Sequence, residues 1–220
     1  MTSTSSIALI GAGCSGFTTA KRLKDAGLAF DWFEASDRIG GNWAFENPNG
    51  MSSAYQSLHI DTSKWRLQFE EFPVPGDWPD FPHHSLMAQY FNAYVDHFGL
   101  RLLVQFSTPV TAVRRAGSGW DVTTPKGTRH YSHVIIANGH HWSPNRPFWP
   151  GNFDGTIIHA HDYKTPFKPV DTIGKRVLVV GMGNSAVDIA SELGQRAITE
   201  KLWVSTRRGV WVLPKFLNGK

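Results

Sequence analysis

One pattern occurs twice in this sequence and constrains the fold more than any other feature. A short apolar run leads into a glycine-rich turn and then into a stretch typical of a helix, first at residues 7–16 and again at residues 177–190. In this arrangement backbone N–H groups and the positive end of a helix point at one place, which suits a pyrophosphate. The key positions are Gly11, Gly13 and Gly16 in the first match, and Gly181, Gly183 and Ala186 in the second.

A single match of this kind is weak, because glycine turns also join strands to helices in ordinary α/β domains. Two matches, each in the strand–turn–helix context, predict two dinucleotide sites. Two such sites favour a relay between two cofactors.

The length and composition are those of a globular protein. A chain of 220 residues with 41% hydrophobic residues allows one large or two small domains. No stretch approaches the roughly 18 apolar residues of a membrane span, and residues 1–6 lack the basic region of a signal peptide. The single cysteine, Cys14, excludes an intrachain disulfide framework and the dithiol that flavin-dependent disulfide reductases need. We therefore expect a cytoplasmic protein without membrane association.

Neither the net charge nor the histidines indicate nucleic acid or a metal ion as a partner. The net charge of +4 and pI of about 9.3 are carried by scattered basic residues, which suits polyanionic dinucleotides better than nucleic acid. The histidines at 83/84, 140/141 and 159/161 have no cysteine or acidic cluster at ligand spacing, so we expect no metal site.

The first half of the chain reads as one nucleotide-binding unit with an insertion. Strands are expected at residues 7–10, 29–33, 102–106 and, fully buried, 133–137; helices at 15–25 and 85–98; and an antiparallel meander at 110–114, 120–124 and 129–131. Glu34 follows the second strand, 18 residues past Gly16, where a carboxylate can accept hydrogen bonds from ribose hydroxyls. Residues 44–84 are aromatic-rich and irregular, typical of a functional loop or of a packed cover over the core.

A second unit follows a proline-rich stretch. It has an expected buried strand at 176–180, a helix at 185–193 and a strand at 201–204. The predicted fold class is therefore α/β, with two Rossmann-like dinucleotide-binding units, the first carrying the β-meander and the second incomplete.

The end of the last expected strand indicates which nucleotide the second unit binds. An NAD site places an acidic residue there, whereas this chain has Arg207 and Arg208. Two guanidinium groups suit a 2′-phosphate and favour NADPH, although a plain basic surface turn is the alternative.

Residues 153–163 resemble the F-x-G-x-x-x-H-x-x-x-Y/F fingerprint of the flavin-containing monooxygenases, matched at Phe153, Gly155, His159 and Tyr163. The stretches 40–43, 181–190 and 207–209 are also similar to motifs of that family. The resemblance covers essentially the whole chain. It implies an FAD-binding domain at residues 1–150, a linker with the fingerprint at 151–173, and the start of an NADPH-binding domain at 174–220.

The resemblance also implies roles for particular residues. It places FAD at the first glycine turn, including Cys14 and Ser15, with Glu34, Gly41, Asn42, Trp43, Ile60 and Asp61. It places NADPH at Gly181, Gly183, Asn184, Ser185, Ala186, Arg207 and Arg208. In the family, NADPH reduces FAD, the reduced flavin forms a C4a-(hydro)peroxide with O₂, and one oxygen atom passes to a soft nitrogen or sulfur nucleophile of a small molecule.

The chain departs from the family pattern in three ways. Asp61 stands where family members have Asn beside the reactive edge of the flavin, and this position makes Asp61 the candidate catalytic residue. Asn138 stands where family members have Thr, and the family members are considerably longer. Baeyer–Villiger oxidation, another NADPH-dependent flavin oxidation, or a non-catalytic nucleotide-binding fragment therefore stay open. A homo-oligomer is also possible, because an apolar strand edge without cover invites association.

Overall fold

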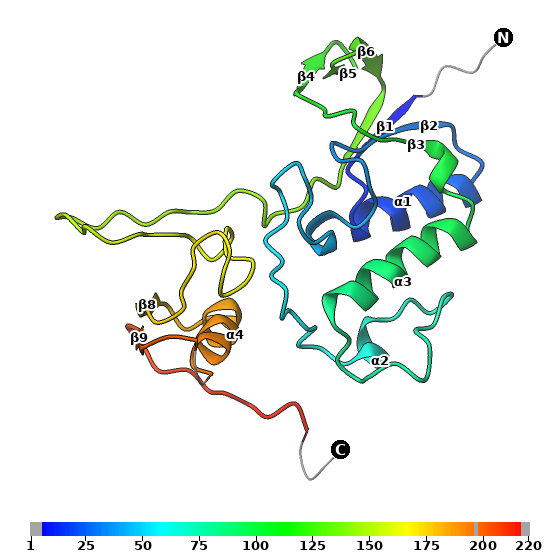
Figure 1. Cartoon of the computed structure of the whole chain (residues 1–220). Helices are drawn as coiled ribbons and strands as arrows, with labels where there is room; N and C mark the ends of the chain where they lie inside the picture. Colours follow the sequence, from blue (N-terminus) through cyan, green and yellow to red (C-terminus); the bar gives the residue numbers. More distant parts are fainter. Residues whose placement is uncertain (1–5, 196–197, 217–220) are drawn as a thin grey trace. The chain divides into compact units, whose positions relative to one another are not determined.

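The computed structural model describes residues 6–195 and 198–216 (Figure 1). Its contacts divide the chain into a first unit, Met1–Ser52 with Ser85–Ser143, and a second unit, Ser53–His84 with Pro144–Lys220. Residues 53–84 therefore pack with the second glycine turn, although they lie within the range 1–150 that the sequence assigns to the first cofactor.

The first unit is built on a parallel sheet with the strand order β3-β2-β1-β7. Its strands are β1 (Ile7–Ile10), β2 (Phe30–Phe33), β3 (Val104–Gln105) and β7 (His133–Ile136). Leu9 of β1 lies beside Trp32 of β2 in the register, and both side chains are fully buried. Because successive strand residues point to opposite faces, Ala8 and Phe33 face the other side of the sheet.

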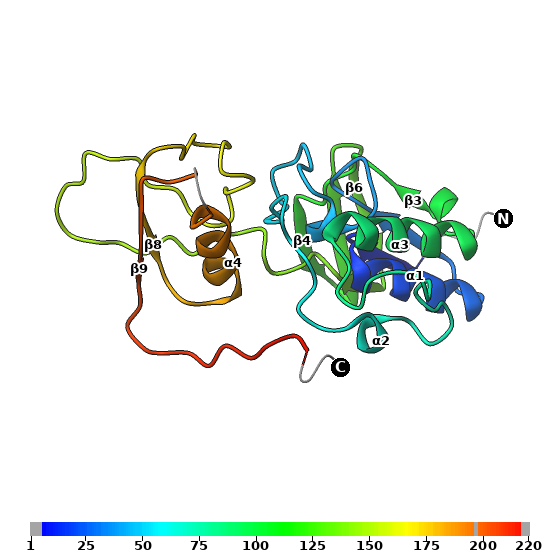
Figure 2. The same cartoon turned by 60° about the horizontal axis from the view of Figure 1, so that its bottom comes forward.

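Two helices of the first unit pack side by side (Figures 1 and 2). They are α1 (Cys14–Asp25) and α3 (His84–His97). The Phe17 ring of α1 lies 5.1 Å from the Phe91 ring and 5.2 Å from the Tyr94 ring of α3. The apolar face that the sequence predicts for this second helix is thus buried against α1.

The meander between β3 and β7 is antiparallel, with the order β4-β5-β6. Its strands are β4 (Ala112–Ala116), β5 (Gly119–Thr124) and β6 (Gly127–Tyr131). Val122 and Tyr131 of the meander form one buried cluster with Ala8 and Phe33 of the parallel sheet. The insertion therefore covers the sheet and completes the core of the first unit.

The second unit contains a two-stranded parallel sheet of β8 (Arg176–Val180) and β9 (Lys201–Ser205), with α4 (Asn184–Leu193) between them in sequence. Val177 and Val179 of β8 pack with Ile189 and Leu193 of α4. This is the strand–turn–helix–strand order expected from the sequence.

The irregular stretch that follows residue 53 is organised by a buried lysine. Lys64 begins the short helix α2 (Lys64–Leu67) and is only 2% exposed. Its ammonium group donates to the carbonyl oxygens of Gly76 at 2.8 Å and of Trp78. A buried charge is tolerated when it is hydrogen-bonded in this way.

Three details of the sequence-based prediction are wrong. The strand predicted at 102–106 is shorter than expected: β3 covers Val104–Gln105, residues 102–103 belong to the 3₁₀ turn η2 (Arg101–Leu103), and the Leu102 side chain is 97% exposed. The strand at 133–137 is not fully buried, because β7 is an edge strand and Ile136 is 64% exposed. The strand at 176–180 is buried on one face only, because α4 covers that face and leaves Leu178 57% exposed.

In the described ranges, none of the helices is both long and apolar enough to cross a membrane.

Candidate dinucleotide-binding sites

The first glycine turn joins β1 to α1 through a conformation that its glycines make possible. Gly11 has φ +100°, and a Cβ there would overlap the Ala137 carbonyl oxygen. Its N–H donates to the Phe33 carbonyl oxygen at 2.7 Å, and its own carbonyl oxygen accepts the Trp32 indole N–H at 2.8 Å. A Cβ at Gly16 would overlap the Gly11 carbonyl oxygen, so Gly16 lets α1 pack closely against the turn.

Gly13 differs from Gly11 and Gly16, because the protein leaves room for a Cβ at this position. It is the N-cap of α1, and in the described part of the chain no side chain caps the helix there. A Cβ on Gly13 would meet only the Gly41 backbone, at the ordinary contact distance of 3.6 Å. The fold itself does not require glycine at this position. The open helix end, with the N–H groups of Cys14, Ser15 and Gly16, is what a pyrophosphate needs.

The Arg38–Trp43 turn lies against this first glycine turn. Gly40 donates its N–H to the Ala12 carbonyl oxygen at 3.1 Å, and a Cβ on Gly41 would stand 3.1 Å from the Gly13 Cα. Gly41, Asn42 and Trp43 form the 3₁₀ turn η1, and all three are partly exposed. The structure thus brings together two sequence stretches that were both assigned to FAD.

Glu34 is buried and makes hydrogen bonds within the protein that the sequence does not indicate. The residue is 8% exposed, and its carboxylate accepts the Ala12 N–H at 2.6 Å and the Ser36 N–H at 2.7 Å. It therefore ties the glycine turn to the loop after β2, a role that sequence reasoning missed. Its carboxylate retains further lone pairs for ribose hydroxyls.

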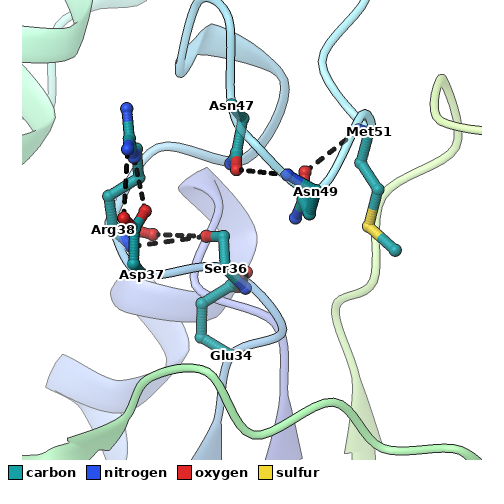
Figure 3. A network of polar contacts seen from close by, with 7 residues as sticks. All are labelled: Glu34, Ser36, Asp37, Arg38, Asn47, Asn49 and Met51. Atoms are coloured by element: carbon teal, nitrogen blue, oxygen red, sulfur yellow. Dashed lines mark hydrogen bonds and ion pairs between the residues drawn. The ribbon is translucent and has the colours of Figure 1, made fainter.

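The loop after β2 is closed by local polar contacts (Figure 3). The Ser36 hydroxyl donates to the Arg38 carbonyl oxygen at 2.9 Å, and the Arg38 guanidinium pairs with Asp37 at 2.6 Å. In the neighbouring loop, the Asn49 side-chain oxygen accepts the Met51 N–H at 3.0 Å. Side-chain contacts within the protein therefore hold the backbone of these two loops around the candidate FAD site.

The second glycine turn repeats the geometry of the first. Gly181 has φ +121° and donates its N–H to the Ser205 carbonyl oxygen at 2.8 Å, as Gly11 does to Phe33. Gly183 is the N-cap of α4, and a Cβ there would have no heavy atom within 4 Å. Asn184, Ser185 and Ala186 form the first turn of the helix, with Ser185 exposed.

A cavity of about 530 Å³ opens beside this turn, and its lining residues are Gly181, Met182, Thr206, Arg207, Arg208 and Val210. The Thr206 hydroxyl closes a tight turn by accepting the Arg208 N–H at 3.3 Å and donating to the Arg208 carbonyl oxygen at 2.5 Å. Both arginines are exposed, and neither has an ion-pair partner within residues 6–195 and 198–216. Two unpaired guanidinium groups in a cavity beside a glycine turn fit a 2′-phosphate.

Residues 55–61 are fastened to α4 by side-chain hydrogen bonds. Tyr55 donates to Asp188 at 2.5 Å, Ser57 donates to Glu192 at 3.0 Å, and Asp61 accepts from Asn184 at 2.5 Å. Burial, followed by hydrogen bonding to Asp188, raises the pKa of the Tyr55 hydroxyl. Asp61, expected beside the flavin from the family resemblance, is therefore in contact with a residue expected at NADPH.

Ile60 precedes Asp61 and is buried. Its N–H donates to the Pro82 carbonyl oxygen at 3.0 Å, and its own carbonyl oxygen accepts from Lys215 at 3.3 Å. These bonds fix the backbone from which the Asp61 carboxylate extends.

The fingerprint residues do not form one cluster. Phe153 is 69% exposed, and its ring lies over Gly155 where a Cβ would otherwise stand. His159 is half-buried and accepts the His161 N–H at 3.1 Å. Tyr163 is buried and donates to Glu192 at 2.7 Å, so it anchors the fingerprint segment to α4. Burial, then the hydrogen bond to Glu192, raises the pKa of the Tyr163 hydroxyl.

The remaining candidate side chains have simpler surroundings. Cys14 is exposed at the start of α1. Within residues 6–195 and 198–216, no three His, Cys, Asp or Glu side chains are grouped so as to hold a metal ion.

A family model described as flavin-binding monooxygenase-like matches residues 4–219. The chain belongs to this family. FAD and NADPH, the two cofactors expected from the sequence, are the cofactors of its flavin-containing monooxygenase members.

Curated relatives agree with this assignment. The chain is 40% identical to rat flavin-containing monooxygenase 5 over 94% of its own length, and 41% identical to rat dimethylaniline monooxygenase (N-oxide-forming) 2 over 95%. In both comparisons it spans 41% of the relative. The chain thus covers about two-fifths of the length of these family members.

Solved structures confirm the α/β fold with Rossmann-like elements. S-allyl-L-cysteine S-oxygenase from Allium sativum matches with a TM-score of 0.82 at 26% identity, over 97% of this chain and 53% of that one. NADP⁺-bound cyclohexanone monooxygenase from Rhodococcus sp. Phi1 matches with a TM-score of 0.74 at 27% identity, over 94% and 39% of the two chains.

Proposed function

We propose that this chain is the cofactor-binding part of a cytoplasmic NADPH- and O₂-dependent flavin monooxygenase that oxygenates a nitrogen or sulfur atom of a small molecule. Family membership supports flavin monooxygenation. The finer assignments to NADPH and to the substrate class rest on the geometry of the second glycine turn and on the fingerprint.

The observation that carries the proposal is the cavity at the second glycine turn. Its lining combines Gly181 and Met182, from the glycine turn that leads into α4, with the unpaired guanidinium groups of Arg207 and Arg208. The first unit offers a matching helix end at Gly13, where Glu34 and the Gly40–Gly41 turn surround the same backbone. One chain therefore has two nucleotide sites of different character.

The protein's own contribution is to bind and orient the cofactors. When bound, NADPH supplies the hydride and FAD supplies the reaction with O₂. The N–H groups at the two helix ends bind pyrophosphates, Glu34 orients an adenosine ribose, and Arg207 with Arg208 selects the 2′-phosphate. No acid, base or nucleophile of the chain has to react.

Tyr163 favours nitrogen or sulfur oxidation, because the fingerprint with Tyr at this position resembles that branch of the family. The related Baeyer–Villiger branch carries Trp followed by Pro or Asp at that end of its fingerprint. Solved relatives include both an S-oxygenase and a cyclohexanone monooxygenase, so fold similarity by itself leaves the two reactions open. The Tyr163 side chain is buried and donates a hydrogen bond to Glu192.

The test supplies the protein with NADPH, isotopically labelled O₂ and, in turn, a tertiary amine, a thioether and a cyclic ketone. We expect yellow protein and label in the N-oxide or the sulfoxide. Label in a lactone from the ketone would favour Baeyer–Villiger oxidation. A colourless protein with no NADPH-dependent O₂ uptake would identify a nucleotide-binding fragment without this activity.

A further inference from the structure

Three residues of α4 form a polar stripe along one face of the helix. Asn184, Asp188 and Glu192 follow one another at intervals of four residues, which places them on the same side. Their partners are Asp61, Tyr55 and Ser57 respectively, all from one short stretch of the chain. The helix after the second glycine turn is therefore oriented along its length by residues 55–61.

The contact at the start of the stripe differs from the other two. Tyr55 and Ser57 donate hydroxyl protons to carboxylates of α4, whereas Asp61 brings a carboxylate to the helix. Its partner Asn184 is the first residue of α4, directly after the N-cap Gly183. In the described ranges Asp61 forms no ion pair, and the nearby Lys215 donates to the Ile60 carbonyl oxygen.

A carboxylate at this end of a helix has two effects of opposite sign on a dinucleotide. It holds the Asn184 side chain, and with it the backbone whose N–H groups would receive the diphosphate. It also places a negative charge near the negative diphosphate, and the repulsion between the two is weakened by salt.

We propose that Asp61 is a positioning residue of the second dinucleotide site, which holds Asn184 in place and at the same time lowers the affinity for the diphosphate by its charge. This inference rests on the proposed function, in which that site binds NADPH. The bonds of Tyr55 and Ser57 hold residues 55–61 on α4 without Asp61, so substitution of Asp61 leaves the segment attached.

The two effects are separated by two variants of the full chain at two salt concentrations. Asp61→Asn removes the charge and keeps an acceptor for Asn184, whereas Asp61→Ala removes both. Asp77→Asn is the matched control, because Asp77 is exposed in the same unit and loses the same charge. The measurement is the Kd for NADP⁺ by titration calorimetry, with the thermal transition of each variant recorded.

At low salt we expect Asp61→Asn to bind NADP⁺ about threefold or more tightly than the wild type, and at high salt equally well. At high salt we expect Asp61→Ala to bind about three- to fivefold more weakly than Asp61→Asn, because Asn184 is released. Asp77→Asn should match the wild type throughout.

Equal affinities of the wild type and Asp61→Asn at low salt would overturn the charge effect. Equal affinities of Asp61→Ala and Asp61→Asn at high salt would overturn the positioning role. A wild-type protein that binds neither NADP⁺ nor adenosine 2′,5′-bisphosphate would instead sink the proposed NADPH site itself, so the two failures are distinguishable.

Discussion

Gly11, Gly13 and Gly16 have different roles within one turn. Gly11 needs a positive φ, and Gly16 has no room for a Cβ beside the Gly11 carbonyl oxygen. At Gly13 a Cβ would make only an ordinary contact with Gly41. Gly13 is therefore the one glycine of the three that the fold does not require, which supports the proposal that its small size serves the cofactor.

We expect Gly13→Ala to lose FAD from a folded protein. The added Cβ displaces the pyrophosphate from the helix N–H groups, and loss of one charge-assisted hydrogen bond of about 1.5–3 kcal/mol weakens binding at least about tenfold. Flavin content and the thermal transition are measured together. Gly16→Ala is the control and should lower the stability by about 1–3 kcal/mol. Full flavin content in Gly13→Ala would contradict this assignment.

His84 provides a pH-dependent contribution to stability. Burial, and then the neighbouring His83, lowers its pKa from 6.5 to about 4. The unfolded chain therefore binds a proton near pH 6.5 that the folded chain accepts only near pH 4. The contribution is intact above pH 6.5 and is lost as the pH falls towards 4, by about 1–3 kcal/mol in total.

This loss is measured as the free energy of unfolding in urea across that pH range. His84→Gln should flatten the profile, because glutamine does not titrate. His97→Asn, at the exposed opposite end of α3, should keep the wild-type slope. Identical slopes for the wild type and His84→Gln would show that other groups cause the acid sensitivity.

At the scale of helices and strands, the sequence predicted correctly the elements that are determined by residue patterns within a short stretch of chain. The two glycine turns, α1, α4 and the meander lie where residue patterns place them, since apolar periodicity and turn residues are local signals. Position within the sheet is not local: nothing in the run from His133 to Ala137 indicates that β7 is an edge strand.

The contacts of the candidate sites were predicted less well, and for the same reason. Gly13 and Gly41 could be assigned to one site by resemblance, but the bond from Ala12 to Glu34 depends on how β1 and β2 pair. The stripe on α4 joins residues more than 100 positions apart. Tyr163 carried the signal of a fingerprint, and only the structure shows that it packs against α4.

Glu192 should couple the fingerprint segment to α4. It accepts from both Tyr163 and Ser57, so Tyr163→Phe removes one bond to a charged acceptor and should destabilise the protein by about 1.5–3 kcal/mol. In a double-mutant cycle with Glu192→Gln, we expect a coupling energy of about 1 kcal/mol or more in urea denaturation. The additive control pairs Glu192→Gln with Tyr131→Phe, because the Tyr131 hydroxyl donates to Asp31 of the first unit. Additive effects of the first pair would refute the coupling.

For the molecule as a whole, the exposed face of the second unit's sheet predicts self-association. Leu178 and Val180 are 57% and 56% exposed, and Trp211 beyond β9 is 95% exposed. In the part of the chain that the structure describes, this sheet has two strands, and an apolar sheet with unpaired edges is a template for pairing. We expect concentration-dependent association of the 220-residue protein in light scattering. Leu178→Thr with Val180→Thr should reduce it, and Leu102→Thr, on the first unit, should not. A strictly monomeric protein at all concentrations would contradict this expectation.

The central claim is that one chain binds FAD and NADPH and passes hydride between them. The most direct test is the anaerobic loss of oxidised-flavin absorbance after mixing with NADPH or NADH, in the wild type and in Arg207→Ala with Arg208→Ala. We predict that NADPH reduces the wild-type flavin, and that the variant needs at least about tenfold more NADPH while its response to NADH hardly changes. Flavin that NADPH leaves oxidised, or an equal loss of response to both nucleotides in the variant, would contradict the account.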